Sequence, residues 1–150
     1  MHLSKSRFTT GLQCHRQLWW RVHEPDAPEL EVDPEQQALF DQGHLVGAVA
    51  RERFPGGVLV DAPHRDFAAR VEQTRRALDA KAPAIFEASF FVDDLFVAVD
   101  VLERTKRGHA IVEVKSSTRV KPEHVPDAAV QTHVLRRFED RRRLRVERAA

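Results

Sequence analysis

Residues 84–115 constrain the fold most, because their apolar side chains alternate with the period of a β-strand rather than that of a helix. Two turn-like segments, Asp93-Asp94 and Thr105-Lys106-Arg107-Gly108, divide this stretch. The pattern therefore predicts an antiparallel meander of three strands, at Ala84–Val92, Leu95–Leu102 and His109–Lys115.

Helical periodicity flanks this sheet on both sides. Helices are expected within residues 3–22, with Leu18 and Trp19 turned inward, and at 34–54, 67–80 and 127–138. Asp33 followed by Pro34 is a good start for the second of these helices. Short strands are expected at 58–60 and 144–147. The predicted fold class is α/β, with a mostly antiparallel central sheet flanked by helices in the order helix, three strands, helix, strand.

The composition indicates one soluble globular domain over residues 1–150, with residues 1–33 as an N-terminal extension. Apolar residues make up 42% and charged residues 31%, which excludes the disordered and the membrane-embedded classes. No apolar run is long enough to span a bilayer, and the N-terminus lacks the apolar core of a secretory signal. We therefore expect a cytoplasmic protein without a membrane partner.

The charge balance alone does not identify a partner. Lys and Arg total 24 and Asp and Glu total 23, so the net charge is +1. Arginines gather at 136–145, in the sequence RRFEDRRRLR. This stretch is suited either to contacts with a phosphate backbone or to a solvated helix face.

The third predicted strand carries charged residues among apolar ones, and these are candidates for a functional site. Glu113 and Lys115 are two positions apart, so they share one face of a strand. A hairpin turning at 105–108 brings Asp100 opposite the Glu113 region, and Glu87 adds a third acid in an apolar strand.

Acids in strands near a core are costly unless they are paired or bind a metal. Asp100, Glu113 and the carbonyl of Val114 would suit Mg²⁺ or Mn²⁺, with Lys115 orienting a water or stabilising charge on a phosphate. The alternative is a solvated polar strand face with a weak cross-strand ion pair.

These motifs resemble a known family. Asp100 followed by Glu113-Val114-Lys115, within helix, three strands and helix, resembles the PD-(D/E)XK nuclease superfamily, and in particular its RecB-like, CRISPR-associated exonuclease branch. A related set of uncharacterised bacterial proteins is similar through LSKSRFTTGLQCHRQLWW and EVKSSTRVKPEHVPDAAVQ. The resemblance implies a restriction-endonuclease-like core, and the chain resembles a shortened member.

The resemblance also implies roles for single residues. Asp100 and Glu113 match the metal ligands, Lys115 the catalytic lysine, and Gln131 a glutamine that positions the substrate strand. Two departures stand against it: Leu135 occupies the place of a tyrosine, and Gly47 the place of a metal-binding histidine. His44 and Glu87 are further candidate ligands, and for His44 a surface or packing role is the alternative.

Cys14 matches the first cysteine of an iron–sulfur cluster found in some relatives. Such a cluster needs four thiolates and this chain has one cysteine, so we expect no cluster unless other ligands are supplied. The alternative for Cys14 is a small buried side chain near Trp19.

The resemblance and the residues together predict a nuclease that uses Mg²⁺ or Mn²⁺ to hydrolyse phosphodiester bonds of DNA, in single strands or at duplex ends, for repair or defence. A catalytically silent module of the same fold, which binds nucleic acid or a protein partner, is the alternative that the two departures favour.

Overall fold

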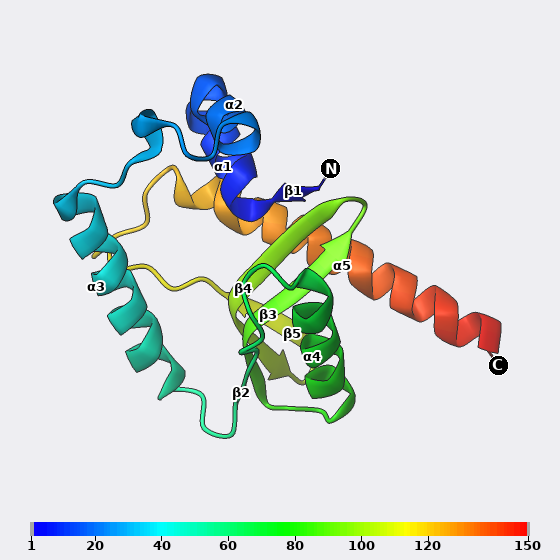
Figure 1. Ribbon diagram of the computed structural model, residues 1–150. Helices are drawn as coiled ribbons and strands as arrows, with labels where there is room; N and C mark the ends of the chain where they lie inside the picture. The colour runs from blue at the N-terminus through cyan, green and yellow to red at the C-terminus, as the bar shows by residue number, and fades with distance from the viewer. Residues whose placement is uncertain (1, 150) are drawn as a thin grey trace.

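The computed structural model describes residues 2–149, with side chains placed for residues 2–141. This part of the chain forms an α/β fold with a mixed five-stranded sheet and five α-helices (Figure 1). The strands are β1 (Leu3–Ser4), β2 (Val58–Leu59), β3 (Ala84–Val92), β4 (Leu95–Thr105) and β5 (Gly108–Val112). The helices are α1 (Lys5–Gln13), α2 (His15–His23), α3 (Pro34–Arg51), α4 (Phe67–Asp79) and α5 (His124–Ala149), with a 3-10 turn at Pro28–Leu30.

The three long strands pair antiparallel, as their turns predict. β3 pairs with β4 from Ala84↔Glu103 to Val92↔Leu95, and β4 pairs with β5. Between β3 and β4 the two turn residues, Asp93 and Asp94, have φ of 51° and 61°. Positive φ at both positions is the geometry that a tight hairpin requires, and aspartate tolerates it better than most residues.

The end of β5 differs from the expected one. The strand stops at Val112 instead of continuing to Lys115. The amide of Val114 donates a hydrogen bond of 2.7 Å to Oδ2 of Asp100, so it joins a side chain rather than the backbone ladder. Glu113 and Lys115 therefore lie just beyond the strand.

Two short strands make the sheet mixed rather than wholly antiparallel. β1 runs parallel to the start of β4, with Leu3 opposite Leu95. β2 runs parallel to β3, with Val58 opposite Ile85. The first residues of the described chain are thus part of the central sheet, on the same edge of β4 that β5 joins further along.

Helices α4 and α5 cover opposite faces of the sheet. The side chain of Ser89 accepts a hydrogen bond from Nε of Arg70 in α4, and the neighbouring Phe90 makes an edge-to-face contact with Phe138 of α5. Since successive strand residues point to opposite faces, the two helices lie on either side (Figure 1). The buried core joins these layers through Val60, Ala77, Ile85, Ala88, Phe90, Val92, Val97, Val99, Leu102, Val130, Val134 and Leu135.

The last strand predicted from the sequence, at 144–147, is wrong. Helix α5 begins at His124 and continues to Ala149. After Pro126 this segment contains neither proline nor glycine, and it is rich in arginine, glutamate and alanine, which are strong helix formers. Helix propensity therefore outweighs the short apolar pattern that suggested a strand. No helix in the described part of the chain is both long and apolar enough to cross a membrane.

The N-terminal helices also differ in part from expectation. Two helices replace the single one expected, with Ser4 and Cys14 as N-caps. Leu18 packs closely on Gly11, where an added Cβ would meet Leu18 Cδ2 at 3.0 Å. Trp19 is 49% exposed, so the prediction that it turns inward is wrong.

Helix α3 has the expected start but not the expected packing. Asp33 caps it by accepting a hydrogen bond of 2.8 Å from the amide of Gln36. Most of its large apolar side chains remain in solvent, with Leu39, Phe40 and Val49 at 62%, 54% and 62% exposure. In Figure 1 this helix stands beside the sheet rather than on it.

Candidate active site

The three acids expected from the sequence lie near one another across the long strands. Glu87 and Asp100 stand between the pairs Phe86↔Val101 and Ala88↔Val99 of β3 and β4. Glu113 directly follows Val112, which is the residue opposite Val101. The sheet register therefore brings Glu87, Asp100 and Glu113 to neighbouring positions, as the hairpin argument predicts.

Asp100 is a half-buried carboxylate that lacks a cationic hydrogen-bond donor in the described residues. Burial and, next, the negative charge of Glu113 raise its pKa from 3.8 to about 6, although the Val114 amide acts in the opposite direction. A carboxylate of this kind favours either a proton or a cation.

Glu113 faces a different set of partners. Its Oε1 lies 2.6 Å from Nζ of Lys115 and 3.3 Å from Nζ of Lys5. Its Oε2 accepts a hydrogen bond of 2.6 Å from Nε2 of Gln131. The predicted residues Glu113, Lys115 and Gln131 are therefore in direct contact.

A fourth charged group completes this cluster. Asp127, near the start of α5, lies 2.7 Å from Nζ of Lys115 and 3.5 Å from Nζ of Lys5. Burial acts to lower the pKa of Lys115, but the hydrogen bonds to Asp127 and Glu113 outweigh it and raise this pKa. Burial likewise acts to raise the pKa of Asp127, while Lys115 and Lys5 bring it below its ordinary value. Lys115 and Asp127 are thus both charged at neutral pH.

Gln131 is completely buried at 0% exposure, and its two side-chain ends differ in their contacts. Its Nε2 donates to Glu113 and to the carbonyl of Asp127. Its Oε1 is buried without a hydrogen-bond partner in the described part of the chain. This acceptor is free for a donor group, such as a water molecule, that the protein itself does not supply.

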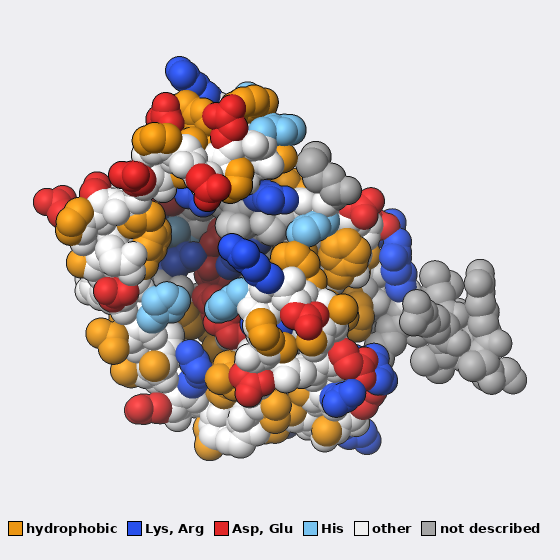
Figure 2. Space-filling view, in the orientation of Figure 1, with side chains coloured by type: hydrophobic (Ala, Val, Ile, Leu, Met, Phe, Trp, Pro, Cys, Tyr) orange, Lys and Arg blue, Asp and Glu red, His pale blue; other side chains and the backbone are white. Residues whose placement is uncertain are grey.

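Asp100 and Glu113 line two neighbouring cavities rather than one. The cavity around Asp100, of about 200 Å³, is also lined by His44, Glu87 and Val114. Helix α3 forms its opposite wall, through Gly43, His44, Gly47 and Arg51. His44 lines this cavity and is exposed, so it is not a packing residue. Figure 2 shows a hollow on this face with acidic side chains at its floor and basic side chains and histidines at its rim.

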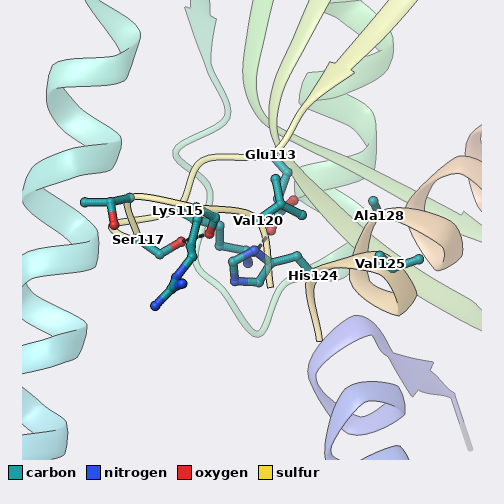
Figure 3. Close-up of a pocket in the computed structure, with 9 residues that line it drawn as sticks. Glu113, Lys115, Ser117, Val120, His124, Val125 and Ala128 are labelled. Atoms are coloured by element: carbon teal, nitrogen blue, oxygen red, sulfur yellow. Dashed lines mark hydrogen bonds and ion pairs between the residues drawn. The ribbon is translucent and has the colours of Figure 1, made fainter. Parts of the chain in front are cut away.

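The cavity beside Glu113 is larger, at about 560 Å³, and Figure 3 shows residues that line it. Lys115 and Ser117 come from the loop after β5, and His124 and Val125 come from the start of α5. The side chain of Val125 is 62% exposed here. This cavity therefore offers a basic and partly apolar surface next to the charged cluster.

Sequence reasoning missed three residues of this region. Asp127 could have been found, because it lies four positions before Gln131 and so on the same helix face. Lys5 could not, since nothing local separates it from an ordinary surface lysine. Arg70 of α4, only 3% exposed, reaches Oε2 of Glu87 at 3.6 Å and donates to Ser89 Oγ.

Glu87 is held in an unusual conformation. Its φ is +57°, which costs of the order of 1–3 kcal/mol for a residue with a side chain. Arg70 donates to the carbonyl of Glu87 at 3.5 Å as well as pairing with its carboxylate. This buried arginine therefore positions the third acid.

Other residues singled out from the sequence have structural roles. Cys14 is exposed and caps α2 by accepting from the amide of Gln17, so the expectation of a buried cysteine is wrong. Leu135 is buried in the core at 7% exposure. Within the arginine-rich stretch, Arg137 and Arg141 pair with Asp93 of the β3–β4 turn, while the side chains of 142–145 lie outside the described residues.

The donor chemistry of the site fits Mg²⁺ or Mn²⁺. Asp100, Glu87, His44 and Val114 line one cavity, and oxygen ligands with an imidazole suit these ions. In the described residues, however, no three His, Cys, Asp or Glu side chains are grouped closely enough to hold a metal ion. Glu113 can join such a site only by giving up part of its contact with the lysines.

Comparison with protein-family models, curated proteins and solved structures finds no match to this chain. Its function is therefore inferred from the residues and their geometry.

Proposed function

We propose that this protein is a metal-dependent nuclease of the PD-(D/E)XK type, which hydrolyses phosphodiester bonds in DNA. The observation that carries the proposal is the contact between Glu113, Lys115 and Gln131 beside Asp100. The spacing of these residues resembles that superfamily, and Gln131 and Asp100 lie far enough from Glu113 in the chain that the fold must bring them to it.

The residues of the chain have distinct proposed roles. Asp100 and Glu113, with the carbonyl of Val114, would hold Mg²⁺ or Mn²⁺, and Glu87 and His44 lie where they could complete its ligands. Such an ion would activate a water and neutralise charge on the phosphate oxygens. Lys115 would donate to that water or to a phosphate oxygen, and Gln131 would offer its unpartnered Oε1 as an acceptor.

The raised pKa of Asp100 supports this assignment. Two neighbouring acids, one of them short of positive charge, form a site that gains from a divalent cation. The buried Arg70 holds Glu87, so that a further acid lies at the same cavity. The backbone of Glu87 is strained in this position. Strain held in place by a buried partner is a frequent feature of functional sites.

The test is cleavage of labelled single-stranded and double-stranded DNA in Mg²⁺, in Mn²⁺ and in EDTA. Asp100→Ala, Glu113→Ala and Lys115→Ala should each reduce the rate by about a hundredfold or more. Matched controls are Asp140→Ala and Lys106→Ala, which change exposed residues and should leave the rate unchanged. Cleavage that persists in EDTA, or in all three site variants, would refute the proposal.

A second candidate function is a non-catalytic module of the same fold that binds nucleic acid. Leu135 favours it, because the position of an expected substrate-contacting tyrosine holds a side chain buried in the core. The double contact of Glu113 with Lys5 and Lys115 also favours it. Salt-dependent DNA binding without cleavage in any divalent ion would support this function over the first.

A further inference from the structure

Four charged groups form a closed arrangement beside the proposed metal site. Lys5 lies between Glu113 and Asp127, at 3.3 and 3.5 Å. Lys115 lies between the same two acids, at 2.6 and 2.7 Å. Two ammonium groups and two carboxylates therefore alternate, and the cluster is neutral as a whole.

The two acids hold the lysines in different ways. Oε1 of Glu113 contacts both ammonium groups. Asp127 instead gives Oδ1 to Lys5 and Oδ2 to Lys115. Both lysines therefore keep one anchor on Asp127 if the carboxylate of Glu113 turns away.

The backbone of Lys5 is fixed by the sheet. Leu3 pairs with Leu95 of β4, and the amide of Leu3 donates to the carbonyl of Asp94 at 2.8 Å. Ser4 then caps α1, of which Lys5 is the first residue. With a side chain only 22% exposed, Lys5 is directed into the cluster and is not a freely moving surface lysine.

The charge balance of the cluster changes if Glu113 ligates a cation, which is a step that rests on the proposed function. When Glu113 ligates a cation, its charge is engaged there, and Asp127 alone remains to balance two ammonium groups. One positive charge then becomes available beside the site. Lys5 makes the longer contacts of the two lysines with both acids, so it is the one more easily released.

We propose that Lys5 is a second phosphate-binding cation of the active site, anchored by Asp127 and masked by Glu113 until that carboxylate ligates a metal ion. The group it binds is a phosphate of the DNA strand, and Asp127 acts as a positioning residue for both lysines. The N-terminal segment would then be part of the catalytic machinery.

The first measurement is Mn²⁺ binding to the metal-free protein by calorimetry, with wild type, Lys5→Met and Lys5→Arg. Removing an ammonium group that competes for Glu113 should tighten Mn²⁺ binding by about twofold to fivefold in Lys5→Met. Lys5→Arg keeps the charge and should stay close to wild type. A residue with a merely structural role would instead weaken Mn²⁺ binding when removed.

The second measurement is the salt dependence of binding to a short labelled single-stranded DNA, in Ca²⁺ to slow cleavage and again in EDTA. In Ca²⁺ the slope of log affinity against log salt should be smaller in Lys5→Met by about 0.7, the value for one phosphate contact. In EDTA, where Glu113 masks Lys5, the two slopes should agree. Lys106→Met, at an exposed turn, is the matched control for loss of one lysine.

Any of three results would overturn the inference. The first is that wild type and Lys5→Met have equal salt slopes in Ca²⁺, and the second is that their slopes differ in EDTA by as much as in Ca²⁺. The third is weaker Mn²⁺ binding by Lys5→Met. If wild type binds Mn²⁺ and cleaves DNA while any of these results holds, only the role of Lys5 fails. If wild type binds no divalent ion, the proposed function fails first, and this inference falls with it.

Discussion

The raised pKa of Asp100 makes a prediction about stability that needs no knowledge of substrate. Burial and the charge of Glu113 raise this pKa from 3.8 to about 6 in the folded chain. Well below pH 3.8 the carboxyl is protonated in both folded and unfolded chains, and the shift has no cost. As the pH rises through 6 the folded chain must release a proton that it holds more tightly, so stability is lost.

The size of the effect follows from the shift. Each pKa unit corresponds to about 1.4 kcal/mol, so ionised Asp100 costs the metal-free fold up to about 3 kcal/mol at pH 8. Asp100→Asn removes the charge and keeps an oxygen that can accept from the Val114 amide. We expect the variant to be more stable than wild type at pH 8 by up to this amount, and close to wild type at pH 4.

The assay is urea unfolding in EDTA at several pH values between 4 and 8, read by circular dichroism. The difference in unfolding free energy between variant and wild type isolates Asp100 from the other titrating groups. Asp140→Asn, which changes an exposed residue of α5, is the matched control and should show a much smaller trend. A difference that does not change with pH, or a variant that is less stable at pH 8, would refute the reasoning.

Two further predictions concern packing. Arg70→Met removes a buried cation that pairs with Glu87 and donates to backbone and side-chain acceptors. The free energy of unfolding in urea should therefore fall by about 3 kcal/mol. A fall below about 1 kcal/mol would contradict the positioning role of Arg70. Gly57→Ala would place a Cβ 2.4 Å from Cζ of buried Phe86 and should cost about 1–3 kcal/mol in the same assay. Gly47→Ala, on open helix surface, should instead stabilise the fold by about 0.5–1 kcal/mol. Equal effects of the two glycine changes on the free energy of unfolding would argue against a close contact between Gly57 and Phe86.

Local sequence patterns predicted much of the fold. The alternation in 84–92 and the Asp93-Asp94 turn predicted the first hairpin, because strand period and turn conformation are properties of neighbouring residues. Asp33 and Pro34 likewise predicted where α3 begins. The same local reasoning failed at 144–147, where a short apolar pattern was weaker than helix propensity.

Part of the candidate site was also accessible from the sequence. The nearness of Asp100 follows from the hairpin. Glu113 and Lys115 are in contact as expected, although not as neighbours on a strand face, because β5 ends at Val112. The approach of Gln131 to Glu113 was expected only through the resemblance to a family, because no local rule relates a strand end to a later helix.

Tertiary structure alone decided the rest. Lys5 and Glu113 are separated by 108 positions, and a lysine near a chain start has no local signature of a buried contact. Only the pairing of β1 with β4 brings Lys5 to the site, and only the docking of α5 brings Asp127 beside it. The sequence thus determined which residues could carry charge-based chemistry. The packing of distant elements determined which charges share a half-buried environment, where their mutual energies are larger because water screens them less.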